Sequence, residues 1–432
     1  MPVRNFLRIR SETHMGKKNL LSFLALPIGE IHYYHYAAQG GGTEIFMKVT
    51  NIKTFTVDCF RTNWVFVKVY TDAGIDGVGE ATLEYKEKAL IGAVEHIKDY
   101  LVGQNPLDIE KHWHAIYRDA YWRGGAVLMS ALSAVETALW DILGKHLGVP
   151  VYQLLGGKVN DRVRIYVNGW FAGAKTPKEF GKKAKIAAER GVTAMKWDPF
   201  GKSYLEISNR DLNTALECIG EVRAAVGSEV DLLIEGHGRF NIPTAIKIAK
   251  ELEQFKPMFF EEPVPPDSLE SLKEVRGKSP VAIAAGERLY TRWDYRKMFD
   301  LAAADYIQPD ISHAGGIMEL KMIAAEAESR YIPFAPHNPS GPVANAATLQ
   351  LAASCPNFSI LEIMYSDVDW RKDVAHEHLE YEDGYIKIPD RPGLGIEIDE
   401  DECAKHPYKP HTLRHYSGAL TDIRPAKTEF YF

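Results

Sequence analysis

Three short apolar runs that each end in a glutamate decide the fold of this chain: VDLLIE at 230–235, PMFFE at 257–261 and VAIAAGE at 281–287. Glu235, Glu261 and Glu287 recur at an interval of 26 residues. An interval of this size holds one strand, one helix and their connections. Repeated βα units build a parallel sheet in which every strand ends at the same edge. We therefore expect the three glutamates at neighbouring strand ends.

The same rhythm extends in both directions from these runs. From Val163 onwards, short apolar strands alternate with amphipathic helices such as 177–190 and 244–255. Eight such units in about 200 residues are typical of a (β/α)₈ barrel. The strands are expected at 163–168, 192–197, 230–235, 257–261, 281–286, 305–309, 331–336 and 359–363.

The residues before the barrel follow a different pattern. Two strand-like runs, 49–57 and 65–70, precede a helical spacing of apolar residues that begins at Leu90. The predicted fold class is therefore α/β, a TIM-type barrel with a small α+β domain formed by N-terminal and C-terminal segments. We predict four parts: an extension at 1–46, the α+β domain at 47–162, the barrel at 163–370 and a returning C-terminal segment at 371–432.

Bulk composition excludes several classes of protein. A net charge of −7 argues against nucleic-acid binding, yet it leaves an anionic substrate open because a bound metal can reverse the local sign. The four cysteines form no Cys-x-x-Cys pair, so we expect a reducing, cytoplasmic compartment without a disulfide or zinc framework. No apolar run approaches the roughly 20 residues that span a bilayer, so no membrane partner is expected.

Residues 1–46 are interpreted separately. The apolar run after Lys17-Lys18 faintly resembles a signal peptide, but Pro27 and Gly29 interrupt it and no clear cleavage site follows. We interpret 1–46 as an extension, or as upstream sequence read as coding, and leave it out of the fold.

Chemistry in a barrel sits at the carboxyl ends of the strands, where Glu235, Glu261 and Glu287 are expected. Three like charges held together are costly unless a cation neutralises them. All-oxygen ligation suits Mg²⁺, with Mn²⁺ as a substitute. The alternative is three separate surface or salt-bridged glutamates, which their common register makes less favourable.

Two histidines are candidates for acid–base chemistry. His337 follows the seventh strand and Asp310 the sixth, so the carboxylate could orient the imidazole and raise its basicity. His237 lies two residues after Glu235, on the same side of an extended segment, and could act as a second acid–base group. The competing interpretation of each is a structural histidine bonded to backbone.

Two further charged residues end barrel strands. Lys196 ends the second strand and could assist with an anionic substrate, unless it only extends its ammonium to solvent. Glu362 ends the eighth strand and could donate a hydrogen bond if burial raises its pKa, although a salt bridge is nearly as favourable.

Several motifs now identify a resemblance. They are ALWDILGK at 138–145, GVPVYQLLGG at 148–157, KWDPFG at 196–201, EGHGRF at 235–240, EEP at 261–263, GER at 286–288, QPD at 308–310, PHNPSGP at 336–342 and PGLG at 392–395. On these motifs the chain resembles the mandelate racemase and muconate-lactonizing families of the enolase superfamily over about residues 47–400. Within them it is most similar to galactonate and gluconate dehydratases, on the evidence of EGHGRF and KWDPFG.

The resemblance implies specific roles for these residues. It implies metal ligation by the three glutamates, His337 with Asp310 as the base and His237 as the acid. It places Glu362 near the substrate carboxylate. Many relatives have aspartate at the position of Glu235.

A second departure concerns racemisation. Racemases of this family carry Lys-x-Lys on the second strand, whereas this chain has Asp198 at the third position. Racemisation, which needs a base on each face, is therefore less favoured unless His237 serves.

The expected reaction is Mg²⁺-dependent dehydration of a sugar acid, an aldonate such as galactonate or gluconate, to a 2-keto-3-deoxy acid through an enediolate. The nearest alternative is epimerisation, racemisation or cycloisomerisation from the same anion. The distant alternative is a sugar-acid-binding relative without turnover.

The remaining expectations concern the substrate's surroundings. By resemblance, the small domain caps the barrel and selects the far end of the substrate, with contacts in Arg61-Thr62-Asn63-Trp64 and Glu84-Tyr85-Lys86. The expected substrate-binding residues are Asp198, Arg288, Trp64 and Tyr85. Relatives are often dimers or octamers, so a homo-oligomer is expected.

Overall fold

The computed structural model describes residues 47–411, and the predicted extension at 1–46 lies outside them. The described chain begins with a three-stranded antiparallel sheet: β1 (Val49–Asp58), β2 (Asn63–Thr71) and β3 (Asp76–Glu80). Helices α1 and α3 pack against this sheet. The helices that follow it are α1 (Glu87–Leu101), α2 (Ile109–His114), the π-helix η1 (Ala115–Asp119), α3 (Ala126–Leu147) and α4 (Val151–Leu154).

Helix α3 corrects one expectation from the sequence. By length and composition it could cross a membrane, so the expectation that no apolar run approaches that length is wrong. However, 78% of the most apolar 18-residue stretch of α3 is buried within the described fold. A Cβ at Gly77 or Gly79 of β3 would collide with the carbonyl oxygens of Ala138 or Ala134, so the sheet and α3 are in backbone contact. α3 is therefore a core helix of the described residues.

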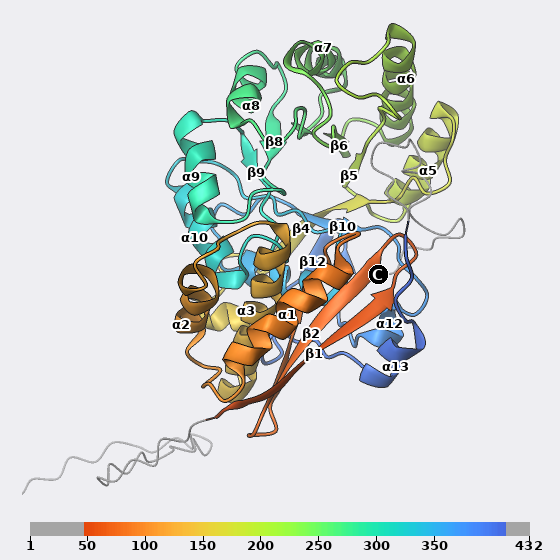
Figure 1. The fold of residues 1–432 in the computed structure, drawn as a ribbon. Coiled ribbons are helices and arrows are strands. Elements are labelled where there is room, and N and C mark those ends of the chain that lie inside the picture. The colour runs from red at the N-terminus through yellow and green to blue at the C-terminus, as the bar shows by residue number, and fades with distance from the viewer. Residues whose placement is uncertain (1–46, 412–432) are drawn as a thin grey trace, which may run out of the picture. The chain divides into compact units, whose positions relative to one another are not determined.

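Strands and helices then alternate as predicted, with the helices outside the strands (Figure 1). The parallel strands are β4 (Arg162–Asn168), β5 (Ala194–Trp197), β6 (Asp231–Glu235), β7 (Phe259–Glu261), β8 (Ile283–Ala285), β9 (Tyr306–Ile307) and β10 (Leu361–Met364). The helices are α5 (Pro177–Glu189), α6 (Asn209–Val226), α7 (Ile242–Leu252) with the 3₁₀ turn η2 (Glu253–Phe255), α8 (Leu269–Arg276), α9 (Arg292–Leu301), α10 (Ile317–Glu328) and α11 (Pro342–Ala353). Strands pair in chain order from β4 to β9, and β10 pairs with β4.

The prediction of a seventh barrel strand over 331–336 is wrong in its extent. A single residue, Phe334, forms parallel bridges to Ile307 and to Phe358. Pro333 and Pro336 flank Phe334, and proline has no N–H to extend a ladder. The bridges still close the sheet between β9 and β10, so the predicted (β/α)₈ class is confirmed.

Side chains fill the interior of the barrel. Seven buried residues form a core cluster there, and the partly buried Tyr306 of β9 packs against it. The seven are Tyr166, Ala194, Leu233, Phe259, Ala284, Ala335 and Ile360. Side chains two residues further along a strand point to the same side. Lys196, Glu235, Glu261 and Glu362 occupy such positions, one layer closer to the carboxyl ends. The barrel geometry thus gathers charged groups at that end.

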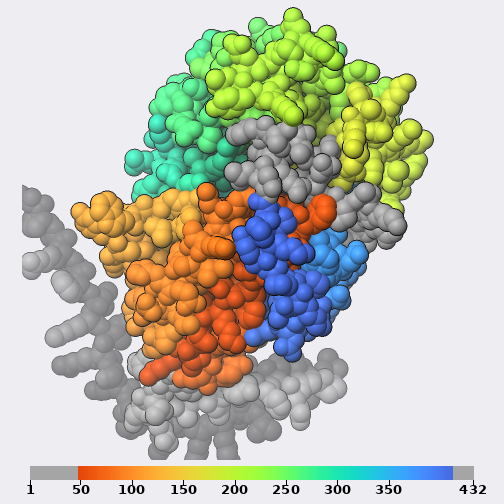
Figure 2. Space-filling view, turned by 45° about the vertical axis from the view of Figure 1, so that its right-hand side comes forward, coloured from red at the N-terminus to blue at the C-terminus, as the bar shows by residue number. Residues whose placement is uncertain are grey.

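The chain after the barrel contains α12 (Arg371–Val374), β11 (Tyr381–Glu382), β12 (Tyr385–Lys387) and α13 (Glu400–Lys405). Strand β12 pairs antiparallel with β4, whereas α13 packs against β1. Figure 2 shows the blue C-terminal residues beside the red-orange strands. The boundaries predicted at 162 and 370 stay a prediction.

Candidate active site

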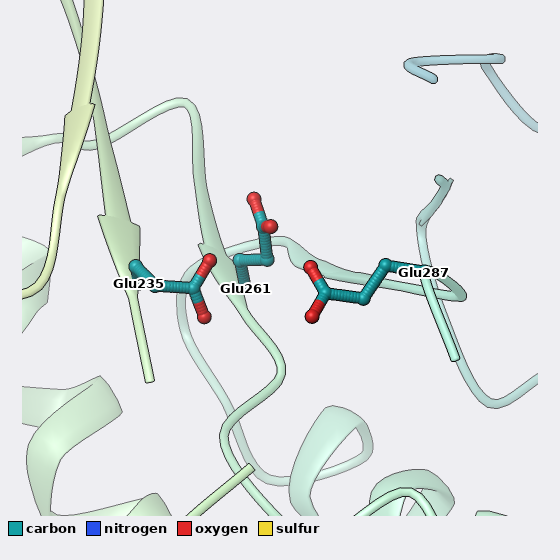
Figure 3. Close-up of side chains that lie close together, drawn as sticks. All are labelled: Glu235, Glu261 and Glu287. Carbon is teal, nitrogen blue, oxygen red and sulfur yellow. The ribbon is translucent and has the colours of Figure 1, made fainter. Parts of the chain in front are cut away.

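Glu235, Glu261 and Glu287 point toward one another from three neighbouring strand ends (Figure 3). Glu235 and Glu261 end β6 and β7 in register with each other, and Glu287 follows β8 after Gly286. One oxygen atom from each carboxylate lies within 4.8 Å of the other two. The sequence interval therefore brought the three side chains together as predicted, while their role as metal ligands stays a prediction.

The electrostatics of these carboxylates fit a cation. Burial raises the pKa of Glu235 to about 7 and, with repulsion from Glu235, raises the pKa of Glu261 well above its usual range. At Glu287, burial is outweighed by His337 and Arg288, which lower its pKa. A hard divalent ion would supply the charge that the buried pair needs, and the all-oxygen donor set suits Mg²⁺ or Mn²⁺.

Lys196 of β5 lies behind the carboxylates. Its Nζ is 2.5 Å from Glu261 Oε1, 3.2 Å from Glu362 Oε1 and 3.3 Å from Glu235 Oε2. The side chain is 2% exposed. Burial opposes its charge, but Glu261 and Glu362 raise the pKa of Lys196 well above its usual range. Lys196 is therefore a fixed ammonium group, unsuited to act as a base.

His337 is paired with Asp310 as the strand order predicted. Its Nδ1 lies 2.7 Å from Asp310 Oδ2, and its Nε2 lies 3.3 Å from Glu287 Oε2. Burial opposes protonation, but Glu287 and Asp310 raise the pKa of His337 to about 10. A cation that neutralised Glu287 would remove the largest of the raising influences.

The surroundings of Glu362 favour one of two interpretations that the sequence left open. The sequence left two interpretations open, a carboxylic acid that donates a hydrogen bond because burial raises its pKa, and a salt bridge, which Lys196 Nζ now forms with it at 3.2 Å. Burial does act in that direction, but Lys196 and His337 hold the pKa of Glu362 below its usual range. Its oxygens accept hydrogen bonds from Asn168 Nδ2 at 2.9 Å and Asn338 N at 3.2 Å. Glu362 is therefore an ionised acceptor.

A second histidine–aspartate pair lies at the other end of the carboxylate row. His237 Nδ1 is 2.6 Å from Asp198 Oδ2, and its backbone N–H donates to Glu235 Oε1 at 2.6 Å. Arg239 Nη2 lies 2.6 Å from Asp198 Oδ1. Burial opposes ionisation of Asp198, but His237 and Arg239 lower its pKa. The side chain of Asp198 is 2% exposed, and His237 and Arg239 occupy its oxygens. Its predicted role in binding substrate stays a prediction.

These groups open into a cavity of about 370 Å³. Arg61, Tyr85 and Arg288 line it, as does Glu84, which forms an ion pair with Arg61. Trp64 does not: it is fully buried in β2, where it pairs with Val57. The structure therefore contradicts its predicted substrate contact.

Sequence reasoning missed several lining residues. Asn168 ends β4 and His313 follows β9, so the strand-end rule that identified the glutamates could have found both. Met364 also lines the cavity and ends β10, so the same rule applies to it, whereas no sequence motif distinguishes Tyr290.

Comparisons with known proteins agree with this geometry. Residues 45–156 match the mandelate racemase / muconate lactonizing enzyme N-terminal domain, and residues 179–402 match the enolase C-terminal domain-like family. A D-galactonate dehydratase of Ralstonia pickettii is 37% identical over 360 residues, 82% of this chain and 93% of the relative. One from Variovorax paradoxus is 35% identical, covering 87% of this chain and 100% of the relative.

Solved structures give the same result. A member of the enolase superfamily from Salmonella Typhimurium is 30% identical, with a TM-score of 0.80, 84% of this chain covered and 98% of that one. A mandelate racemase/muconate lactonizing enzyme-like protein from Rubrobacter xylanophilus is 34% identical with a TM-score of 0.77, covering 85% and 99%. Fold and site define an enolase-superfamily protein. The chain belongs to the mandelate racemase/muconate lactonizing enzyme family, which confirms the resemblance noted in its motifs.

Proposed function

We propose that this chain catalyses the Mg²⁺-dependent dehydration of an aldonate, such as galactonate or gluconate, to a 2-keto-3-deoxy acid. It is a hydro-lyase, and its D-galactonate dehydratase relatives align with it almost end to end. The observation that carries the proposal is a histidine–aspartate pair at each end of the carboxylate row. Elimination of water needs two such groups, because one takes a proton from carbon and the other gives a proton to the departing hydroxyl.

The metal and the charged residues would prepare the substrate. Glu235, Glu261 and Glu287 would hold Mg²⁺, which would supply positive charge to the substrate carboxylate as its neighbouring C–H bond breaks. Lys196 holds Glu261 and Glu362 in place and adds a second fixed positive charge within the site.

Proton transfer would fall to the two histidines. Asp310 accepts the Nδ1 hydrogen of His337, so its Nε2 would take the C2 proton and leave an enediolate. His237, bonded through Nδ1 to Asp198, would give a proton to the 3-hydroxyl. The C3–O bond breaks, water leaves, and the resulting enol tautomerises to the 2-keto-3-deoxy acid.

The test is incubation with Mg²⁺ and a panel of aldonates and aldarates in D₂O, followed by proton NMR. We expect a 2-keto-3-deoxy product with deuterium at C3, and a chelator should abolish its formation. Loss of the C2 proton signal with the carbon skeleton intact would replace dehydration by epimerisation or isomerisation. A cytoplasmic homo-oligomer, from dimer to octamer by family resemblance, completes the proposal.

A further inference from the structure

His313 lies in the cavity wall and has no part in the proposed proton transfers. It stands three residues after Asp310, in a turn organised by that aspartate: the N–H groups of His313 and Ala314 donate to Asp310 O at 3.1 and 2.8 Å. Ser312 N donates to Asp310 Oδ1 at 2.7 Å. The turn places the imidazole Nε2 3.9 Å from Asp310 Oδ2, with the side chain 13% exposed.

A serine of helix α3 determines which ring nitrogen carries the hydrogen. Ser130 Oγ lies 2.8 Å from His313 Nδ1 and donates to Ala126 O at 2.7 Å. A hydroxyl has a single hydrogen to donate, so Ser130 accepts from His313 Nδ1–H. Burial lowers the pKa of His313, which keeps the ring neutral near pH 7. Nε2 therefore presents a lone pair.

A lone pair that the protein leaves without a hydrogen-bond donor can accept one from a bound molecule. Nε2 and Asp310 Oδ2 are both acceptors, and their separation of 3.9 Å is too long for a hydrogen bond. Hydroxyl groups are the donors that an aldonate brings in number, and in the proposed reaction those at C2 and C3 would face the metal and the two catalytic histidines. We infer that His313 determines specificity by accepting, at Nε2, a hydrogen bond from a hydroxyl beyond C3 of the substrate. This inference rests on the proposed function, because it assumes a polyhydroxylated acid.

Two substitutions at His313 distinguish the roles of its two ring nitrogens. His313→Asn can keep an N–H toward Ser130 but loses the acceptor at Nε2. His313→Gln extends an amide oxygen toward the place of Nε2 and should recover part of the loss. Ser130→Ala leaves the ring in place without fixing its tautomer, so a smaller loss is expected. His146→Asn, on the exposed face of the same helix, is the matched control and should behave as wild type.

The measurement is kcat and KM for wild type and variants on the aldonate and on its 4-, 5- and 6-deoxy counterparts. In His313→Asn, kcat/KM for the full substrate should fall about 2- to 12-fold, mainly through KM. For wild type, kcat/KM should be lower by a similar factor on one of the deoxy substrates than on the full substrate. For His313→Asn, kcat/KM should be the same on that deoxy substrate as on the full substrate. An equal loss on every substrate, or a loss confined to kcat, would overturn the inference.

Binding gives a readout that does not depend on turnover. The same four acids are titrated into Mg²⁺-loaded His337→Asn enzyme, with and without His313→Asn. The same hydroxyl-specific loss of affinity is expected there. If wild type dehydrates no aldonate, the proposed function fails while this titration still decides the role of His313. Affinity that is insensitive to His313→Asn for all four acids would overturn the inference.

Discussion

His237 Nδ1 lies 2.6 Å from Asp198 Oδ2, the same pairing that joins His337 to Asp310 at 2.7 Å. Each aspartate is buried and each holds its imidazole by the same ring nitrogen. The two pairs differ in their surroundings: His337 also faces Glu287 through Nε2, whereas Asp198 is also bound by Arg239. Two similar pairs in unlike electrostatic settings can divide the roles of base and acid.

Replacing His337 by Asn should abolish chemistry while leaving the metal site intact. The amide keeps the shape of a short polar side chain but cannot take the C2 proton, so we expect turnover to fall at least about 10²–10⁴-fold with Mg²⁺ bound. C2 deuterium exchange in D₂O should fall with it. Normal turnover in this variant would contradict the assignment of the base. His146→Asn, on an exposed helix face, serves as the control.

His237→Gln should separate proton removal from loss of water. The base at His337 is untouched, so the C2 proton should still exchange with D₂O, whereas the 3-hydroxyl lacks its proton donor. We expect dehydration to fall about 10²–10⁴-fold with exchange largely retained, followed by NMR in one sample. Equal loss of both signals would show that His237 acts before or during proton removal.

Mg²⁺ should stabilise the folded chain because it offsets the repulsion among buried carboxylates. At a hundredfold excess over Kd, a ligand that binds only the native state adds about 2.7 kcal/mol to the free energy of unfolding. The measurement is the melting temperature with Mg²⁺ and with chelator. Glu261→Gln should lose this Mg²⁺-dependent increase, while Glu229→Gln, an exposed control, should keep it. An undiminished increase in Glu261→Gln would place the ion elsewhere.

Much of the site could be predicted because barrel periodicity converts sequence spacing into position. The interval of 26 residues put Glu235, Glu261 and Glu287 on adjacent strand ends, and strand order put Asp310 beside His337. The seventh strand was harder, since the prolines at 333 and 336 remove the hydrogen bonds that define a strand.

Other features depend on distances that a sequence does not contain. Trp64 is buried because both faces of β2 are covered, and its neighbours Asn63 and Val65, which point to the opposite side, are buried as well. Glu362 is ionised because Lys196, from a different strand, lies 3.2 Å away. Without such distances, burial alone predicts the opposite direction for its pKa.

A last relationship joins the small domain to the barrel through one buried carboxylate. Glu136 of α3 accepts hydrogen bonds from Ile317 N at 2.7 Å and Met318 N at 3.0 Å, in the first turn of α10. Trp140 Nε1 donates to it at 2.7 Å. Burial still raises the pKa of Glu136 to about 8, above the usual 4.5. The folded protein therefore binds a proton that the unfolded chain releases between these two values.

This proton makes stability depend on pH in a predictable direction. The contribution from protonated Glu136 is complete below about pH 4.5 and is lost as pH rises toward about 8. Glu136→Gln cannot ionise, so the stability of wild type relative to the variant should decline with rising pH, by up to about 1.4 kcal/mol per unit. Urea unfolding of both proteins at pH 5.5, 6.5 and 7.5 with Mg²⁺ measures the difference. Parallel curves would mean that the three N–H donors hold Glu136 ionised throughout, and that the helix N-terminus outweighs burial.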